Sequence, residues 1–236
     1  MRESTVLKCN CLTYAKSVRG ESVFFSTLIS NESSNDPYSK DIKIVPILIG
    51  NLDQAAELEY GEKIAPYLAQ EGTIVIVSSD FCHWFVGSLC QFNCCNFFFY
   101  QRGQRYNYTF YYPKSKPIAS PFSPDEGWHI TRASPPDPDQ SIWESITQLD
   151  HEGMGILADK NRSALTAHTD FHKYLNKTSN TICGCHAIGV LWGALARLES
   201  ASGRKASCTW VKYDQSAQVT EVSEFSVSYA SGWITI

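Results

Sequence analysis

The sequence predicts an α/β protein in which helices flank a sheet. In the first third of the chain, two strand-like segments at residues 43–50 and 73–77 enclose a helical segment at about 53–68. Helical patterns then fill much of residues 140–200, and strand-like patterns return near the C-terminus. A strand–helix–strand unit makes a parallel pair with a right-handed crossover, so we expect its two strands to share one sheet.

Local chemistry sets the boundaries of the predicted elements. Thr73–Val77 is a short β-branched run, typical of a buried strand. Asp53 is a suitable N-cap for the first helix, and Ser163 for a helix to about residue 175. Another helix is predicted at about 140–158, and strands at 206–213 and 225–229. The helix predicted at 183–200 carries an apolar stripe of Ile188, Leu191, Leu195 and Leu198.

The bulk composition is that of an ordinary globular chain. Its 236 residues, 43% hydrophobic and 19% charged, suffice for one domain spanning 1–236. The net charge of −4 gives no electrostatic reason to expect nucleic acid as a partner. No apolar run reaches the roughly 20 residues that span a bilayer, so we expect no membrane insertion.

Cysteine usage indicates the cellular compartment. The nine cysteines are odd in number, and the N-terminal residues lack the apolar core of a secretion signal. We therefore expect reduced thiols and a cytoplasmic protein, with the nucleus as a second expected location.

Polar residues follow the strand predicted at 73–77. Asp80 and His83 lie three residues apart in Ser78-Ser79-Asp80-Phe81-Cys82-His83-Trp84. A carboxylate orients an imidazole and raises its basicity, and sites in open α/β sheets form at the carboxyl ends of strands. We interpret Asp80 and His83 as an acid/base pair; the alternative is a helix N-cap and a structural histidine.

Cys183 and His186 form a second candidate group at the start of an apolar helix. The free N–H groups of a helix N-terminus lower the pKa of a thiol there, and His186 follows one turn later. A thiolate with an imidazole is a soft donor set suited to copper(I), zinc or iron. The alternative is a buried structural cysteine.

Other metal patterns are weak. Cys9-x-Cys11 and Cys94-Cys95 have no second pair at a zinc-site spacing. His168 and His172 are four apart on a predicted helix but lack the Glu of a His-Glu-x-x-His pattern, so we place both at the surface, as we do His129 and His151.

Five ordered segments resemble the Memo family. They are Lys43–Gly50, Ser78–Trp84, Gly103–Tyr108, Asn180–Val190 and Ser226–Gly232. The resemblance implies the class III extradiol dioxygenase (LigB-like) fold and a copper- or iron-binding site. It assigns a metal-ligand role to Cys183 and a place in the cleft to Arg105 and Tyr106, where the alternative is sheet packing.

Two features depart from the family pattern. Cys11 falls near the position of a family histidine ligand, and a first strand with a further histidine is expected before Met1, so we expect an incomplete metal site. Residues 85–102 interrupt the family's His-Trp-Gly run as an atypical insertion. Codons that could encode these residues include an intron-like start and end, so we interpret the stretch as a retained intron; the alternative is a genuine insertion.

Two functions stay open. The resemblance implies a metal- or redox-linked role in cell signalling or motility, with copper or iron as cofactor and a copper- or iron-dependent oxidoreductase as the enzyme class. Dioxygenase activity does not follow from the fold alone. The alternative is a non-catalytic adaptor whose pocket holds a phosphopeptide of a signalling partner, or another ligand.

Overall fold

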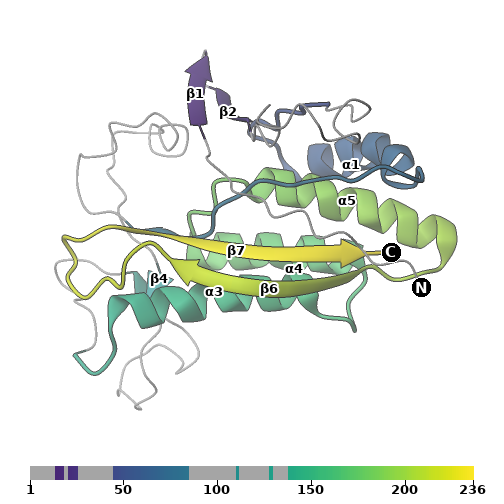
Figure 1. Cartoon of the computed structure of the whole chain (residues 1–236). Helices are drawn as coiled ribbons and strands as arrows, with labels where there is room; N and C mark the ends of the chain where they lie inside the picture. The colour runs from purple at the N-terminus through teal and green to yellow at the C-terminus, as the bar shows by residue number, and fades with distance from the viewer. Residues whose placement is uncertain (1–13, 19–20, 26–44, 85–109, 112–127, 130–137) are drawn as a thin grey trace, which may run out of the picture.

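The computed structural model describes residues 14–18, 21–25, 45–84, 110–111, 128–129 and 138–236 (Figure 1). Within these residues four helices and seven strands are assigned. The helices are α1 (Gln54–Leu68), α3 (Ile142–Ala158), α4 (Ala164–Thr178) and α5 (Cys185–Ser202). The strands are β1 (Tyr14–Val18), β2 (Glu21–Phe25), β3 (His83–Trp84), β4 (Phe110–Tyr111), β5 (Trp128–His129), β6 (Ser207–Gln215) and β7 (Ser226–Thr235).

The helices are stacked beside a small antiparallel sheet. The sheet has the order β3-β7-β6, and its main ladder pairs Ser207 with Thr235 and Gln215 with Ser228. Figure 1 shows α3 beside β6 of the long β6–β7 ribbon, α4 next to α3 and α5, and α5 next to α1. The arrangement confirms the α/β class at the coarse level.

The four predicted helices of the described chain are confirmed, with ends shifted by a few residues. Asp53 caps α1 by accepting a hydrogen bond from the Ala56 amide at 2.8 Å, and Ser163 caps α4 in the same way from Thr166 at 3.1 Å. The α3 helix begins with a capping box between Ser141 and Glu144. Each cap satisfies amide donors that have no partner within the helix.

The predicted parallel strand pair is wrong. Residues 45–50 and 73–77 form no strand, and their apolar side chains are largely exposed, Val45 by 78% and Ile74 by 77%. The chain pairs instead at β3, where His83 lies opposite Val227 in an antiparallel ladder with β7. A β-branched run becomes a strand only where another strand accepts its backbone hydrogen bonds, and neither segment is paired with a strand in the described part of the chain.

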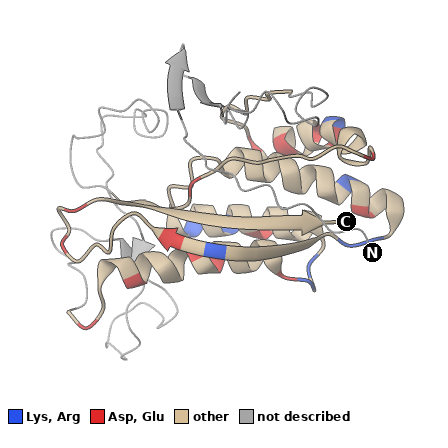
Figure 2. Cartoon of the chain, viewed as in Figure 1, with Lys and Arg blue, Asp and Glu red and all other residues tan. Residues whose placement is uncertain are grey.

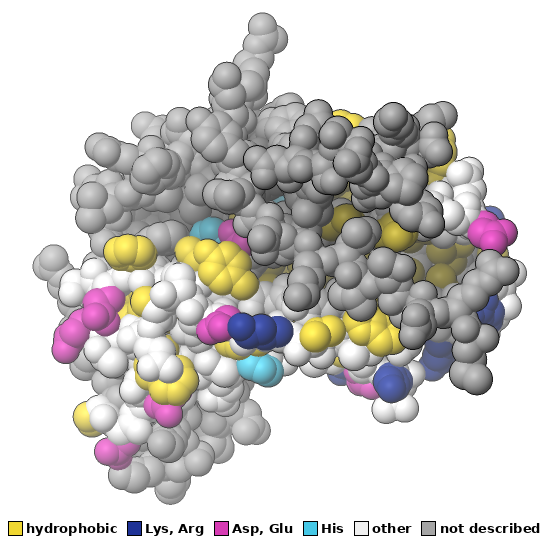
Figure 3. Space-filling model, in the orientation of Figure 1, with side chains coloured by type: hydrophobic (Ala, Val, Ile, Leu, Met, Phe, Trp, Pro, Cys, Tyr) yellow, Lys and Arg dark blue, Asp and Glu magenta, His cyan; other side chains and the backbone are white. Residues whose placement is uncertain are grey.

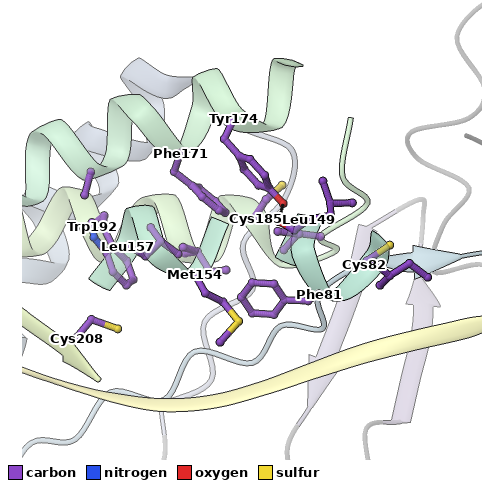
Figure 4. Close-up of a cluster of buried hydrophobic side chains, with 14 of the residues drawn as sticks. Phe81, Cys82, Leu149, Met154, Leu157, Phe171, Tyr174, Cys185, Trp192 and Cys208 are labelled. Atoms are coloured by element: carbon purple, nitrogen blue, oxygen red, sulfur yellow. Dashed lines mark hydrogen bonds between the residues drawn. The ribbon is translucent and has the colours of Figure 1, made fainter. Parts of the chain in front are cut away.

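The main hydrophobic core lies between the helices and the β6–β7 ribbon. Figure 4 shows Phe171 and Tyr174 of α4 directed towards Leu149 and Met154 of α3. Phe81 meets Trp210 of β6 edge-on, with ring centroids 5.7 Å apart. The segment before β3 is therefore anchored in this core and fixes the neighbouring polar residues.

The contact between α1 and α5 depends on glycine. A Cβ atom added to Gly61 would lie 2.6 Å from the carbonyl carbon of Gly193, and one added to Gly189 would overlap the Glu57 carboxylate. Only the absence of side chains at these positions lets the two helices approach closely. Glu57 is consequently enclosed, with 0% of its surface exposed.

The described surface mixes both charge signs. In Figure 2, Lys and Arg are dispersed among Asp and Glu on the described helices and strands. Figure 3 shows hydrophobic side chains on the same face. Exposed hydrophobic side chains of the described residues include Val211 of β6 and Trp233 of β7. No helix among the described residues is long and apolar enough to cross a membrane.

Candidate metal centre

Asp80, His83 and Cys183 come together in the structure. One potential ligand atom from each lies within 4.8 Å of those of the other two. The His83 Nε2 atom is 3.7 Å from a carboxylate oxygen of Asp80, which is longer than a hydrogen bond. Cys183, which the sequence placed in a separate candidate group, thus shares one site with Asp80 and His83.

Two contacts hold these segments together. The Thr181 hydroxyl accepts a hydrogen bond from the His83 amide at 2.8 Å and donates to the His83 carbonyl at 2.9 Å. The Gly184 amide donates to the Ser79 hydroxyl at 3.1 Å. A Cβ atom on Gly184 would lie 2.5 Å from that of Ser79, so the approach requires glycine.

Burial sets the protonation of this site. Removal from water lowers the pKa of His83 to about 4, so the imidazole is neutral near pH 7 and keeps a lone pair for a ligand. Burial also raises the pKa of Asp80. Burial raises the pKa of Tyr229 on β7, and the charges of Asp80 and Cys183 raise it further.

A second cluster surrounds Glu57. One carboxylate oxygen is 2.7 Å from the Nε2 atom of His168 and 2.6 Å from that of His172. The other oxygen is 2.7 Å from the Nδ1 atom of His186. Although burial opposes ionisation, hydrogen bonds from the three histidines hold the pKa of Glu57 far below its usual value.

The surface placement of His168 and His172 is therefore wrong. Their side chains are only 1% and 10% exposed, because α4 turns them towards α1. Sequence spacing showed that the two share a helix face but not that a buried Glu on another helix would face them. His151, by contrast, is exposed as expected.

Cys183 and His186, which the sequence placed in one candidate group, lie in different clusters of the structure. The helix starts at Cys185, so Cys183 lies before its first residue, and the His186 side chain hydrogen-bonds to Glu57. The described residues thus provide Asp80 and His83 as the neighbours of Cys183.

Three predicted site residues are not covered. Cys11, Arg105 and Tyr106 lie outside the described residues, as does the insertion at 85–102.

A buried polar network supports the segment before β3. One oxygen of Asp150 accepts from the Cys82 amide at 3.2 Å and from Asn180 at 2.8 Å. The other accepts from Tyr213 at 2.8 Å and from Ser228. This carboxylate links α3, the segment before β3, the segment before α5 and both long strands, so it fixes the backbone on either side of the site.

Comparisons with known proteins agree with this arrangement. The family described as "Memo-like protein" matches residues 23–233. Protein MEMO1 of Xenopus tropicalis is 32% identical over 201 residues, which cover 85% of this chain and 51% of the relative. Protein MEMO1 of Danio rerio is 33% identical, over 84% of this chain and 50% of the relative.

A more distant relative matches over a similar share of this chain. The MEMO1 family protein MHO1 of Saccharomyces cerevisiae is 29% identical over 83% of this chain and 52% of its own length. The chain spans about half the length of the curated relatives it matches. The family match over nearly the whole chain, together with these identities, shows that this chain belongs to the Memo family.

Proposed function

We propose that this Memo-like protein has a metal-linked redox role in cell signalling, with Asp80, His83 and Cys183 as the metal-binding groups. The observation that carries the proposal is the convergence of a carboxylate, an imidazole and a thiol within 4.8 Å. A metal site needs several donors on one point, and these come from two segments about a hundred residues apart in the sequence.

The donors fit copper or iron. A thiolate favours copper(I) and iron, and a neutral imidazole suits both. His83 is already neutral near pH 7, so its nitrogen binds a cation without first losing a proton. Cys183 must release its proton, which makes binding tighten as the pH rises. Such a metal supplies one-electron chemistry when bound.

The protein residues would hold and orient the group. Thr181 fixes the backbone of His83, and Gly184 keeps Cys183 against residues 78–79. Three donors leave a coordination position open, as catalytic sites do for substrate. Cys11, which the resemblance places near a family ligand position, lies outside the described residues. The proposal therefore rests on three donors.

An anaerobic titration with copper(I), which favours a thiolate over a site of imidazoles and carboxylate alone, tests the proposal. Wild-type protein is expected to bind one equivalent saturably, and Cys183→Ala to lose this binding. Cys208→Ala is the matched control, because Cys208 is a buried thiol in the core on β6. Equal, weak binding by all three proteins would contradict the proposal.

The adaptor function is tested with the same proteins. No contact of the described residues selects a phosphopeptide, so this function stays a prediction from the sequence. Metal-independent binding of a phosphopeptide, lost on changing Asp80 or Arg105 but kept in Cys183→Ala, would favour the adaptor over the metal-linked role.

A further inference from the structure

We propose that Glu57, His168 and His172 form a second site, which binds a divalent cation of the zinc type. The site lies between α1 and α4 and is separate in its donor atoms from the group around Cys183. It contains no thiol, so its chemistry differs from that of the first site.

The three side chains converge on a single point. The Nε2 atoms of His168 and His172 contact the same oxygen of Glu57, at 2.7 and 2.6 Å. Their potential ligand atoms all lie within 4.8 Å of one another. Two imidazoles and one carboxylate are a known three-ligand set for zinc.

The helices fix this geometry. His168 and His172 are four residues apart on α4, a spacing that places both rings on one helix face, and their ring centroids are 4.8 Å apart. Glu57 lies in the first turn of α1, against Gly189 of α5. A carboxylate enclosed in this way has little freedom to turn away from the histidines.

His186 completes the arrangement from the other side. Its Nδ1 atom lies 2.7 Å from the second oxygen of Glu57, which leaves the first oxygen directed at His168 and His172. Hydrogen bonding to the non-ligating oxygen is how proteins orient a metal-bound carboxylate. The side chains of His172 and His186 are 10% and 16% exposed, so the cluster has its route to solvent on their side.

The metal replaces protons that the histidines now share with Glu57. The present nitrogen–oxygen separations are hydrogen-bond distances. In a tetrahedral zinc complex with bonds of about 2.0–2.1 Å they would be about 3.3 Å. The side chains must open by roughly 0.6 Å, and each ligating imidazole then carries its proton on Nδ1.

The test uses the full chain with the first site disabled. In a Cys183→Ala background, zinc(II) and cobalt(II) are titrated by equilibrium dialysis and visible absorption. One equivalent of cobalt(II) is expected to bind with the absorption of a tetrahedral ion and without a thiolate charge-transfer band. His168→Gln in this background should abolish saturable binding, and His186→Gln should weaken it about 10- to 100-fold.

The matched control is His151→Gln. His151 is an exposed histidine on α3, outside the cluster, so its replacement should leave zinc affinity unchanged. Circular dichroism and the unfolding midpoint show whether each variant folds, and zinc should raise the midpoint of every variant except His168→Gln.

Two results would overturn the proposal. One is that folded Cys183→Ala protein binds neither zinc nor cobalt; this outcome does not depend on whether His168→Gln folds. The other is equal affinity with and without His168. Either result leaves the copper(I) titration of the Cys183 site unaffected, so the two proposals fail independently.

Discussion

Replacing Gly189 by Ala should destabilise the protein strongly, because the new methyl group would occupy the space of the Glu57 carboxylate. Glu57 is fully buried and accepts hydrogen bonds from three histidines. The substitution must displace this carboxylate or separate α1 from α5. Either response breaks the buried cluster.

The expected magnitude follows from three terms. Overpacking a core costs about 1–3 kcal/mol. Breaking a buried ionic cluster costs about 3–5 kcal/mol, since a charge is left without its partners. Ala is favoured over Gly in a helix by about 1 kcal/mol. The net loss in the free energy of unfolding should therefore be about 3–7 kcal/mol.

Urea unfolding followed by tryptophan fluorescence measures this loss, with Gly155→Ala as the control. Gly155 also lies inside a helix, but a Cβ atom there meets nothing within 4 Å. Gly155→Ala should stabilise the protein by up to about 1 kcal/mol through helix propensity alone. Opposite signs for the two substitutions are the expected outcome.

A double-mutant cycle isolates the cause. If the cost of Gly189→Ala arises from Glu57, most of it should disappear in a Glu57→Ala background. The coupling free energy between the two substitutions should then reach or exceed about 3 kcal/mol, the upper end of the usual range. The reasoning is refuted if Gly189→Ala costs the same with and without the Glu57 side chain, or if it behaves like Gly155→Ala.

Three further outcomes are expected. Asp150→Asn should lower the free energy of unfolding by about 2–4 kcal/mol in urea titrations, because an amide cannot accept from donors at both ends. Burial lowers the pKa of His83 from 6.5 to about 4 in the folded protein, so between these pH values the unfolded chain takes up the His83 proton and the folded protein does not. The free energy of unfolding should therefore fall by about 3 kcal/mol as the pH is lowered from 6.5 to 4. This loss should be absent in His83→Gln. Gly184→Ala should push Ser79 away and weaken copper(I) binding at Cys183 in the anaerobic titration.

The sequence predicted the helices better than the sheet. Caps such as Asp53 and Ser163 act within a few residues, so a local pattern contains all the chemistry they need. Strand pairing depends on partners far along the chain. The apolar runs at 45–50 and 73–77 had strand composition, yet the ladder formed at His83 and Val227 instead.

The candidate site was predicted only in part, because it also depends on contacts between residues far apart in the sequence. Asp80 and His83 are close in sequence, and the resemblance to the Memo family pointed to Cys183; the structure adds that all three meet. Nothing in the sequence pairs Glu57 with His168, His172 and His186, because that contact requires the glycine-dependent packing of α1 on α5. The sequence signal was limited to the spacing of His168 and His172, four residues apart on a predicted helix and therefore on one helix face.

The short segment 183–186 connects the two clusters. Cys183 faces Asp80 and His83, while His186 holds the second oxygen of Glu57. Between them, Gly184 packs on Ser79 and is the N-cap of α5. A rigid helix start therefore carries one member of each cluster, so a cation that opens the histidines around Glu57 would also shift the backbone next to Cys183. Metal occupancy at the buried site should accordingly change copper(I) affinity at the other, and linkage requires the reverse effect to be equal in free energy.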